Sequence, residues 1–106
     1  MADAALNRHY VEQRSSRRHT VTLRSVLVES ATIGEHVDIL NIARLGFLAR
    51  SRLCRKTGQG VRLHLPGLVP IEARVVWCDK RLLGGRFHEP IDEAEFETFL
   101  AAIRAQ

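Results

Sequence analysis

The sequence predicts a mainly β protein, a small six-stranded antiparallel β-barrel with a C-terminal amphipathic α-helix. Short stretches in which apolar and polar residues alternate recur along most of the chain, and turn residues separate them at fairly even intervals. Near the end, the alternation gives way to helical spacing. With 106 residues there is room for one domain, expected over residues 14–104 behind a flexible N-terminal tail of residues 1–13.

Alternation places the expected strands at residues 20–29, 35–40, 47–50, 61–65, 71–78 and 82–87. The first strand ends in consecutive apolar residues, so we expect a bulge near Ser25. Residues 41–46 have the mixed chemistry of a bend, and residues 79–81 that of a hairpin turn. In the fifth strand Trp77 continues an apolar face and is expected in the core, the alternative being a stacking contact at the barrel rim.

The C-terminal helix is expected over residues 92–104. Asp92 followed by Glu95 resembles an acidic capping box. The apolar side chains after it are spaced to share one face of a helix; they are Phe96, Phe99, Leu100 and Ile103. The helix is therefore expected to close against the barrel.

Arginine dominates the positive charge. The formal net charge is +4, and 14 arginines stand against only Lys56 and Lys80. A guanidinium grips phosphate with a planar fork and stacks on flat rings, although a GC-rich genome would also favour arginine. Residues 14–18 and residues 44–62 are both basic and flank the early barrel, so they are expected to converge on one anionic ligand.

Cysteine usage and the N-terminus predict a cytoplasmic protein. Cys54 and Cys78 form no C-x-x-C pair and are expected to be reduced thiols. The N-terminus lacks the apolar stretch of a signal peptide, and no apolar run is long enough to insert in a membrane.

Two short motifs resemble those of the PilZ family of bacterial second-messenger receptors, which pairs an R-x-x-x-R arm with a later [D/N]-x-S-x-x-G element. The arm here is Arg14-Ser-Ser-Arg-Arg18, and the second element is Asn41-Ile-Ala43-Arg-Leu-Gly46. Trp77 and the Gly85-Arg-Phe87 ending of the last strand are also similar to the family. The resemblance extends from about residue 12 to residue 100.

The resemblance implies that the ligand is cyclic di-GMP (c-di-GMP), which presents phosphates and guanines. The implied ligand-binding residues are Arg14, Arg18, Asn41, Ala43 and Gly46, and further candidates are Arg17, Arg44, Trp77 and Gly85. Arginine can pair with phosphate or with the guanine O6/N7 edge and can stack on guanine. An asparagine oxygen can accept from a guanine N–H, and a glycine leaves the ligand's path free of a Cβ.

Ala43 departs from the family pattern, which has serine at that position. Loss of one neutral hydrogen bond costs about 0.5–1.5 kcal/mol, a two- to tenfold weaker affinity. An unpaired donor left on the ligand would raise that cost. The implied role of Asn41 also has an alternative, a turn residue that bonds its own backbone.

No enzyme motif is present. The sequence contains no G-x-S-x-G, no G-x-x-x-x-G-K and no H-E-x-x-H, and no two histidines have metal-ligand spacing. Neither catalytic residues, nor a metal site, nor a cofactor is expected.

The sequence leaves three functions open. The first is a c-di-GMP receptor whose N-terminal arginine arm closes over the ligand and changes a surface for a protein effector. The second is a degenerate PilZ-like protein-interaction adaptor that no longer binds nucleotide, which Ala43 would favour. The third is a DNA- or RNA-binding barrel, suggested by the pI near 9.8 but not expected, because few aromatic residues are available as stacking platforms.

Overall fold

The computed structural model describes residues 17–29, 34–52 and 55–104. The predicted tail at residues 1–13, Arg14 and Cys54 lie outside the described residues. The elements are β1 (His19–Glu29), β2 (Glu35–Ile42), β3 (Gly46–Arg50), β4 (Gly60–His64), β5 (Ile71–Asp79), β6 (Leu82–Phe87) and α2 (Glu93–Arg104). The predicted fold class, a six-stranded antiparallel barrel with a C-terminal helix, is confirmed.

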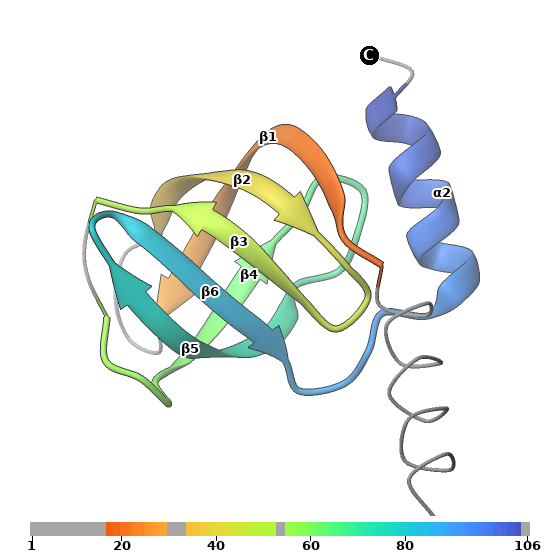
Figure 1. Ribbon diagram of the computed structural model, residues 1–106. Coiled ribbons are helices and arrows are strands. Elements are labelled where there is room, and N and C mark those ends of the chain that lie inside the picture. The colour runs from red at the N-terminus through yellow and green to blue at the C-terminus, as the bar shows by residue number, and fades with distance from the viewer. Residues whose placement is uncertain (1–16, 30–33, 53–54, 105–106) are drawn as a thin grey trace, which may run out of the picture.

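The six strands close on themselves in the order β1-β2-β3-β6-β5-β4, and β1 completes the circle by pairing with both β2 and β4 (Figure 1). All the pairings are antiparallel. Closure leaves every strand with two hydrogen-bonded neighbours, so the sheet has no free edge. The largest of the fully buried side chains are Leu27, Val37, Ile39, Ile42, Leu63, Val75 and Leu83.

The hairpins differ in detail from the expected turns. The β5–β6 turn consists of Lys80 and Arg81, whose φ angles of 49° and 70° give the left-handed backbone that suits a two-residue hairpin. β2 continues to Ile42, so Asn41 belongs to a strand and pairs with Thr20 and Leu48. The bend is confined to the short link between β2 and β3.

The prediction of a bulge near Ser25 is wrong. Ser25 pairs regularly with Val37, and the irregularity of β1 lies between Thr20 and Leu23. Ser25 is buried and its hydroxyl donates to the carbonyl of His64 on β4. That hydrogen bond satisfies a polar side chain in the barrel interior, so the strand needs no bulge at Ser25.

The expected core position of Trp77 is also wrong. The register of β5 against β6 shifts between Val75 and Trp77. Because a bulge inserts one extra residue, it reverses the faces beyond it. Val75 is therefore buried, whereas Val76 and Trp77 are 45% and 43% exposed on the outside of the barrel.

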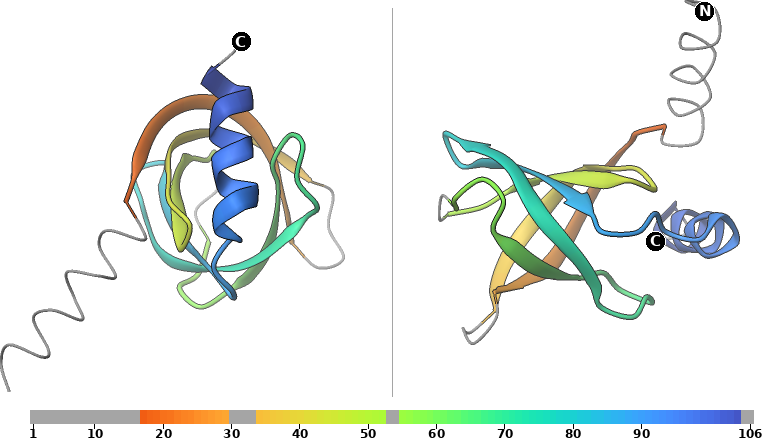
Figure 2. Two further views of the ribbon diagram at one scale, coloured as in Figure 1. Left: turned by 90° about the vertical axis from the view of Figure 1, so that its right-hand side faces the viewer. Right: turned by 90° about the horizontal axis from the view of Figure 1, so that it is seen from below.

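Helix α2 lies across one open end of the barrel (Figure 2). The Asp92 carboxylate accepts from the backbone N–H of Glu95 at 3.1 Å, so Asp92 is the predicted N-cap. Phe96, Phe99 and Leu100 are buried and join the barrel core. Within the described residues, no helix is long and apolar enough to cross a membrane.

Candidate functional site

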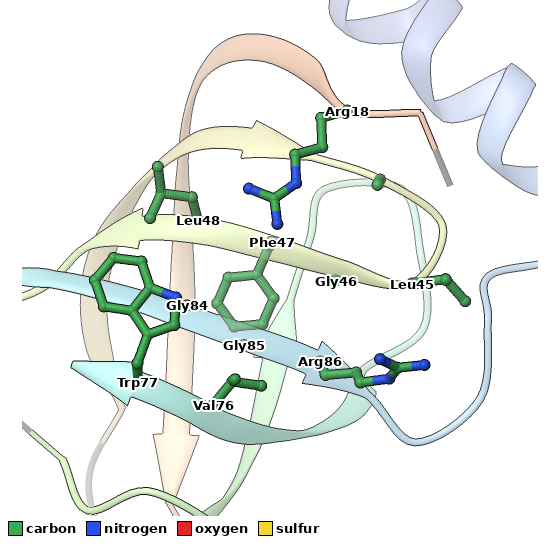
Figure 3. Close-up of a pocket in the computed structure, with 11 residues that line it drawn as sticks. Arg18, Leu45, Gly46, Phe47, Leu48, Val76, Trp77, Gly84, Gly85 and Arg86 are labelled. Atoms are coloured by element: carbon green, nitrogen blue, oxygen red, sulfur yellow. The ribbon is translucent and has the colours of Figure 1, made fainter. Parts of the chain in front are cut away.

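The candidate site is a pocket on the outer wall of the barrel, over β3, β6 and β5 (Figure 3). It has a volume of about 270 Å³. Arg18, just before β1, reaches it from above β3, and Arg86 borders it on β6. The wall residues that line it are Gly46, Phe47, Leu48, Val76, Trp77, Gly84 and Gly85, and the β2–β3 link adds Ala43 and Leu45.

Trp77 lies against β6 because Gly84 has no side chain. A Cβ at Gly84 would stand 2.2 Å from the indole Nε1 of Trp77, a distance no structure tolerates. The β5 bulge turns Trp77 outward, and Gly84 lets its ring settle on the strand (Figure 3). The result is a half-exposed aromatic surface beside the pocket, suited to stacking against a flat ring.

The other glycines of the site serve packing. A Cβ at Gly85 would point inward, 2.4 Å from the ring of Phe47. A Cβ at Gly46 would lie 2.3 Å from the carbonyl oxygen of Gly85. The close contact between β3 and β6 therefore requires a residue without a Cβ at position 46, whether or not a ligand passes there.

Two arginines at the pocket have no acidic partner among the described residues. Arg18 and Arg86 are exposed, and neither forms an ion pair there. Arg86 also lies directly opposite Arg74 in the β5–β6 ladder, and facing like charges destabilise a sheet. An anion at this wall would relieve that repulsion.

Asn41 and Ala43 lie near the same end of β2. Ala43 is buried, lines the pocket and donates its N–H to the carbonyl of Gly46 at 2.9 Å. Asn41 does not line the pocket, although its cross-strand neighbour Leu48 does. Its Oδ1 is buried and finds no hydrogen-bond donor in the described structure. An unpaired buried acceptor costs about 1–3 kcal/mol, so a hydrogen-bond donor that reached the Asn41 Oδ1 would be stabilised there.

Segment 44–62 contributes apolar and glycine residues to the pocket, but none of its basic side chains lines it, contrary to expectation. The Arg44 Nε donates to the carbonyl of Ile91 at 2.8 Å, and Arg62 pairs with Glu72 at 2.6 Å. Arg55 is buried beside Glu35. Local charge in the sequence does not reveal where a barrel directs each side chain, because alternate residues face opposite ways. Of the other candidates, Arg17 is exposed outside the pocket lining.

Sequence reasoning missed Arg86 and Val76 as site residues. Arg86 stands between the inward-facing Gly85 and Phe87, so simple alternation places it outside. The signal for the bulge is Val75-Val76-Trp77, three consecutive apolar residues in a strand that otherwise alternates. A bulge predicted from that run would have placed Trp77 on the outside of the barrel.

Chemically, the pocket combines guanidinium groups with an exposed indole and open backbone. Such a surface suits a ligand that carries both negative charge and flat rings. In the described part of the chain, no group of three His, Cys, Asp or Glu side chains is placed to hold a metal ion.

Comparison with known proteins identifies the family. A family model described as PilZ domain matches residues 12–105, nearly the whole chain. No curated protein matches the sequence. The match spans the arm, all six strands and α2, in the order in which they occur here. The chain belongs to the PilZ domain family.

Proposed function

We propose that this chain is a c-di-GMP receptor, a binding module and not an enzyme. The carrying observation is the pocket itself, where Arg18, Arg86 and the exposed Trp77 meet on one wall. The ligand complements this wall: its negative charge neutralises the guanidinium groups, and its purine rings cover the indole. Family membership supports the same ligand class.

Each residue has a role in this proposal. Arg18 and Arg86 pair with phosphate or with the O6/N7 edge of guanine. Trp77 stacks on a guanine face from the outer wall of the barrel, a stacking role like the one that was the alternative to a core position. Asn41 accepts a guanine N–H with its unpaired Oδ1. Arg14 adds a second arm arginine that closes over the ligand.

Ligand binding would reach a protein effector through the start of β1. His19, next to Arg18, packs edge-on against Phe96 of α2 with ring centroids 5.6 Å apart. Its Nδ1 lies 3.2 Å from the Arg104 guanidinium at the other end of α2. A shift of the arm would therefore change the contacts of His19 with α2. A cytoplasmic effector that contacts α2 would then bind with a different affinity.

Calorimetric titration with c-di-GMP tests the proposal, with wild-type protein beside an Arg14→Ala/Arg18→Ala variant. Loss of charge-assisted hydrogen bonds should weaken binding at least about tenfold. Arg62→Ala is the matched control, because Arg62 pairs with Glu72 and does not line the pocket. GTP and a short single-stranded oligonucleotide serve as ligand controls. Absence of heat and of thermal stabilisation with c-di-GMP would refute the receptor function, and equal oligonucleotide binding would favour a nucleic-acid surface.

The second candidate is a PilZ-like adaptor that no longer binds nucleotide. One observation favours it: the Ala43 methyl lines the pocket where the family pattern has a hydroxyl. The titration separates the two functions. An adaptor would give no c-di-GMP heat while keeping its fold and its effector.

A further inference from the structure

A second hollow lies away from the arginine pocket, between α2 and the β4–β5 loop. Two adjoining cavities of about 500 and 450 Å³ share the lining residues Leu68, Val69 and Glu95. They form one groove, which we call the helix-side groove. One side is the loop of residues 66–70, and the other is the segment 88–92 together with α2. None of its lining residues lines the arginine pocket.

An apolar side chain stands at the centre of this groove. Val69 is 77% exposed, the largest exposed fraction among the large hydrophobic residues that the structure describes. The backbone presents it firmly, because Gly67 has a φ of 81° and Leu68 donates its N–H to the Leu65 carbonyl at 3.2 Å. Pro70 follows at once. A firmly held apolar residue costs little conformational entropy when a partner covers it.

The floor and walls around Val69 are apolar as well. Ile91 and Phe99 are buried side chains that still reach the groove surface, and Leu68 and Ile71 are half-buried. An apolar side chain that packed on Val69 would therefore also contact apolar groups beneath it. The driving force for covering these groups is hydrophobic.

The rim of the groove is acidic. Glu72, Glu89, Asp92 and Glu95 line it, and no lysine or arginine does. Glu72 pairs with Arg62, and Asp92 caps α2. Glu89 and Glu95 are exposed and form no ion pair with any described residue. The groove is thus negative on a chain whose formal net charge is +4.

We propose that the helix-side groove docks a segment of a partner protein in which a large apolar side chain is flanked by arginine or lysine. The apolar side chain packs on Val69 and the groove floor, and the basic residues pair with Glu89 and Glu95. Charge complementarity orients the segment and excludes acidic partners such as nucleic acid. This surface stands on its own geometry, so it holds whether or not the arginine pocket binds c-di-GMP.

A random dodecapeptide library displayed on phage and selected against the full chain identifies the preferred segment. The selected peptides should be enriched in arginine or lysine next to leucine, phenylalanine or tryptophan. A fluorescein-labelled copy of the best peptide is then titrated by fluorescence anisotropy. Enrichment of acidic peptides, or of polar peptides without an apolar residue, would overturn the proposal.

Two variants locate the bound peptide. Val69→Ser should weaken it about fivefold or more, since one apolar contact is lost. Glu89→Gln/Glu95→Gln should weaken it by a similar factor and should flatten its salt dependence. Glu93→Gln/Glu97→Gln is the matched control, because these glutamates are exposed on α2 outside the groove and should leave the affinity unchanged.

Unchanged affinity in both groove variants, or equal loss in the control, would contradict docking at this site. Sedimentation of the wild type tests the other occupant. Self-association that disappears in Glu89→Gln/Glu95→Gln would assign the groove to a second copy of the chain and would overturn the partner segment.

Discussion

Arginine has opposite surroundings in two regions of the barrel. Near the start of β2, the Arg55 side chain is 4% exposed and donates to Glu35 at 2.6 Å and to the Ser51 hydroxyl at 2.9 Å. On the outer wall, Arg18 and Arg86 are exposed and have no acidic partner among the described residues. The same residue type thus stabilises the fold in one region and is available to a ligand in the other. The partner distinguishes the two uses.

Glu35 organises the first region. Besides Arg55, it accepts from the backbone N–H of Arg52 at 2.9 Å and from the Ser51 hydroxyl at 3.1 Å. The N–H of Ser51 donates to the carbonyl of Arg81 at 2.8 Å, which ties this cluster to the β5–β6 turn. One carboxylate therefore fixes the segment after β3 in place.

The largest expected effect comes from removing that carboxylate. Glu35→Gln removes the carboxylate that pairs with the buried Arg55 guanidinium at 2.6 Å, so the free energy of unfolding should fall by about 3 kcal/mol in urea titrations. Glu72→Gln is the control: the Arg62–Glu72 pair has the same 2.6 Å distance but is more than half exposed. It should cost at most about 1 kcal/mol. If both variants lost the same unfolding free energy, the buried Arg55–Glu35 pair would not stabilise the fold more than an exposed pair does.

The same carboxylate predicts a pH dependence. Burial raises the pKa of Glu35, but the hydrogen bonds from Arg55, Arg52 and Ser51 outweigh it and hold the pKa below the usual 4.5. The folded state therefore binds its proton less tightly than the unfolded state does. The stabilisation is full above pH 4.5 and disappears as the pH falls through the lowered value. Unfolding titrations across that range should show a smaller acid-induced loss of stability for Glu35→Gln than for the wild type.

Substitutions at the adjacent glycines Gly84 and Gly85 of β6 should distinguish an effect on the core from an effect on the pocket. Gly85→Ala forces a methyl group into the Phe47 ring and should cost about 1–3 kcal/mol of stability. Gly84→Ala instead displaces the Trp77 indole, which has solvent on its outer side. It should weaken c-di-GMP binding, while lowering the melting temperature less than Gly85→Ala does. Thermal melts and calorimetry on the two variants check this, and loss of stability without loss of affinity in Gly84→Ala would contradict a stacking role for Trp77.

A smaller effect is expected at the position that departs from the family pattern. Ala43→Ser restores a hydroxyl at the pocket and should improve c-di-GMP affinity two- to tenfold, about 0.5–1.5 kcal/mol. Ala101→Ser, on the exposed face of α2, is the matched control and should leave calorimetric affinity unchanged. A weaker Ala43→Ser complex would argue that the ligand does not reach the β2–β3 link.

The smallest effect concerns the contact between the arm and α2. Burial lowers the pKa of His19, and the nearby Arg104 and Arg17 lower it further. The neutral ring is favoured in the folded state, so its stabilisation is present above pH 6.5 and is lost as the pH falls through the lowered pKa. Between neutral and mildly acidic pH, the wild type should lose slightly more stability in thermal melts than His19→Gln. Identical pH profiles of the two proteins would mean that burial and the nearby Arg104 of α2 do not lower the pKa of His19.

Most of the fold could be predicted from the sequence because its signals are local. Alternation located all six strands, and the Asp92 cap located the start of α2. The errors occur where a partner strand decides the outcome. The bulge that exposes Trp77 depends on how β5 meets Gly84 and Gly85 of β6, and Ser25 stays in register because β4 offers a carbonyl acceptor.

The candidate site was predictable only in part for the same reason. The motif residues Arg18, Ala43 and Gly46 meet at one pocket, as their order in the sequence suggested. Arg86 and Arg44 behave differently from what a count of charges implies, since one faces the pocket and the other is held by the Ile91 carbonyl. Which arginine finds a partner is a property of the tertiary structure.

Trp77 is the only tryptophan of the chain, and it stands beside the pocket. The tryptophan fluorescence of this protein therefore comes from one indole in a known place. Occupancy of the wall would change the emission without any dye, whereas events at the helix-side groove would leave it nearly unaltered. The bulge in β5 has thus given the molecule a native optical reporter that distinguishes its two surfaces.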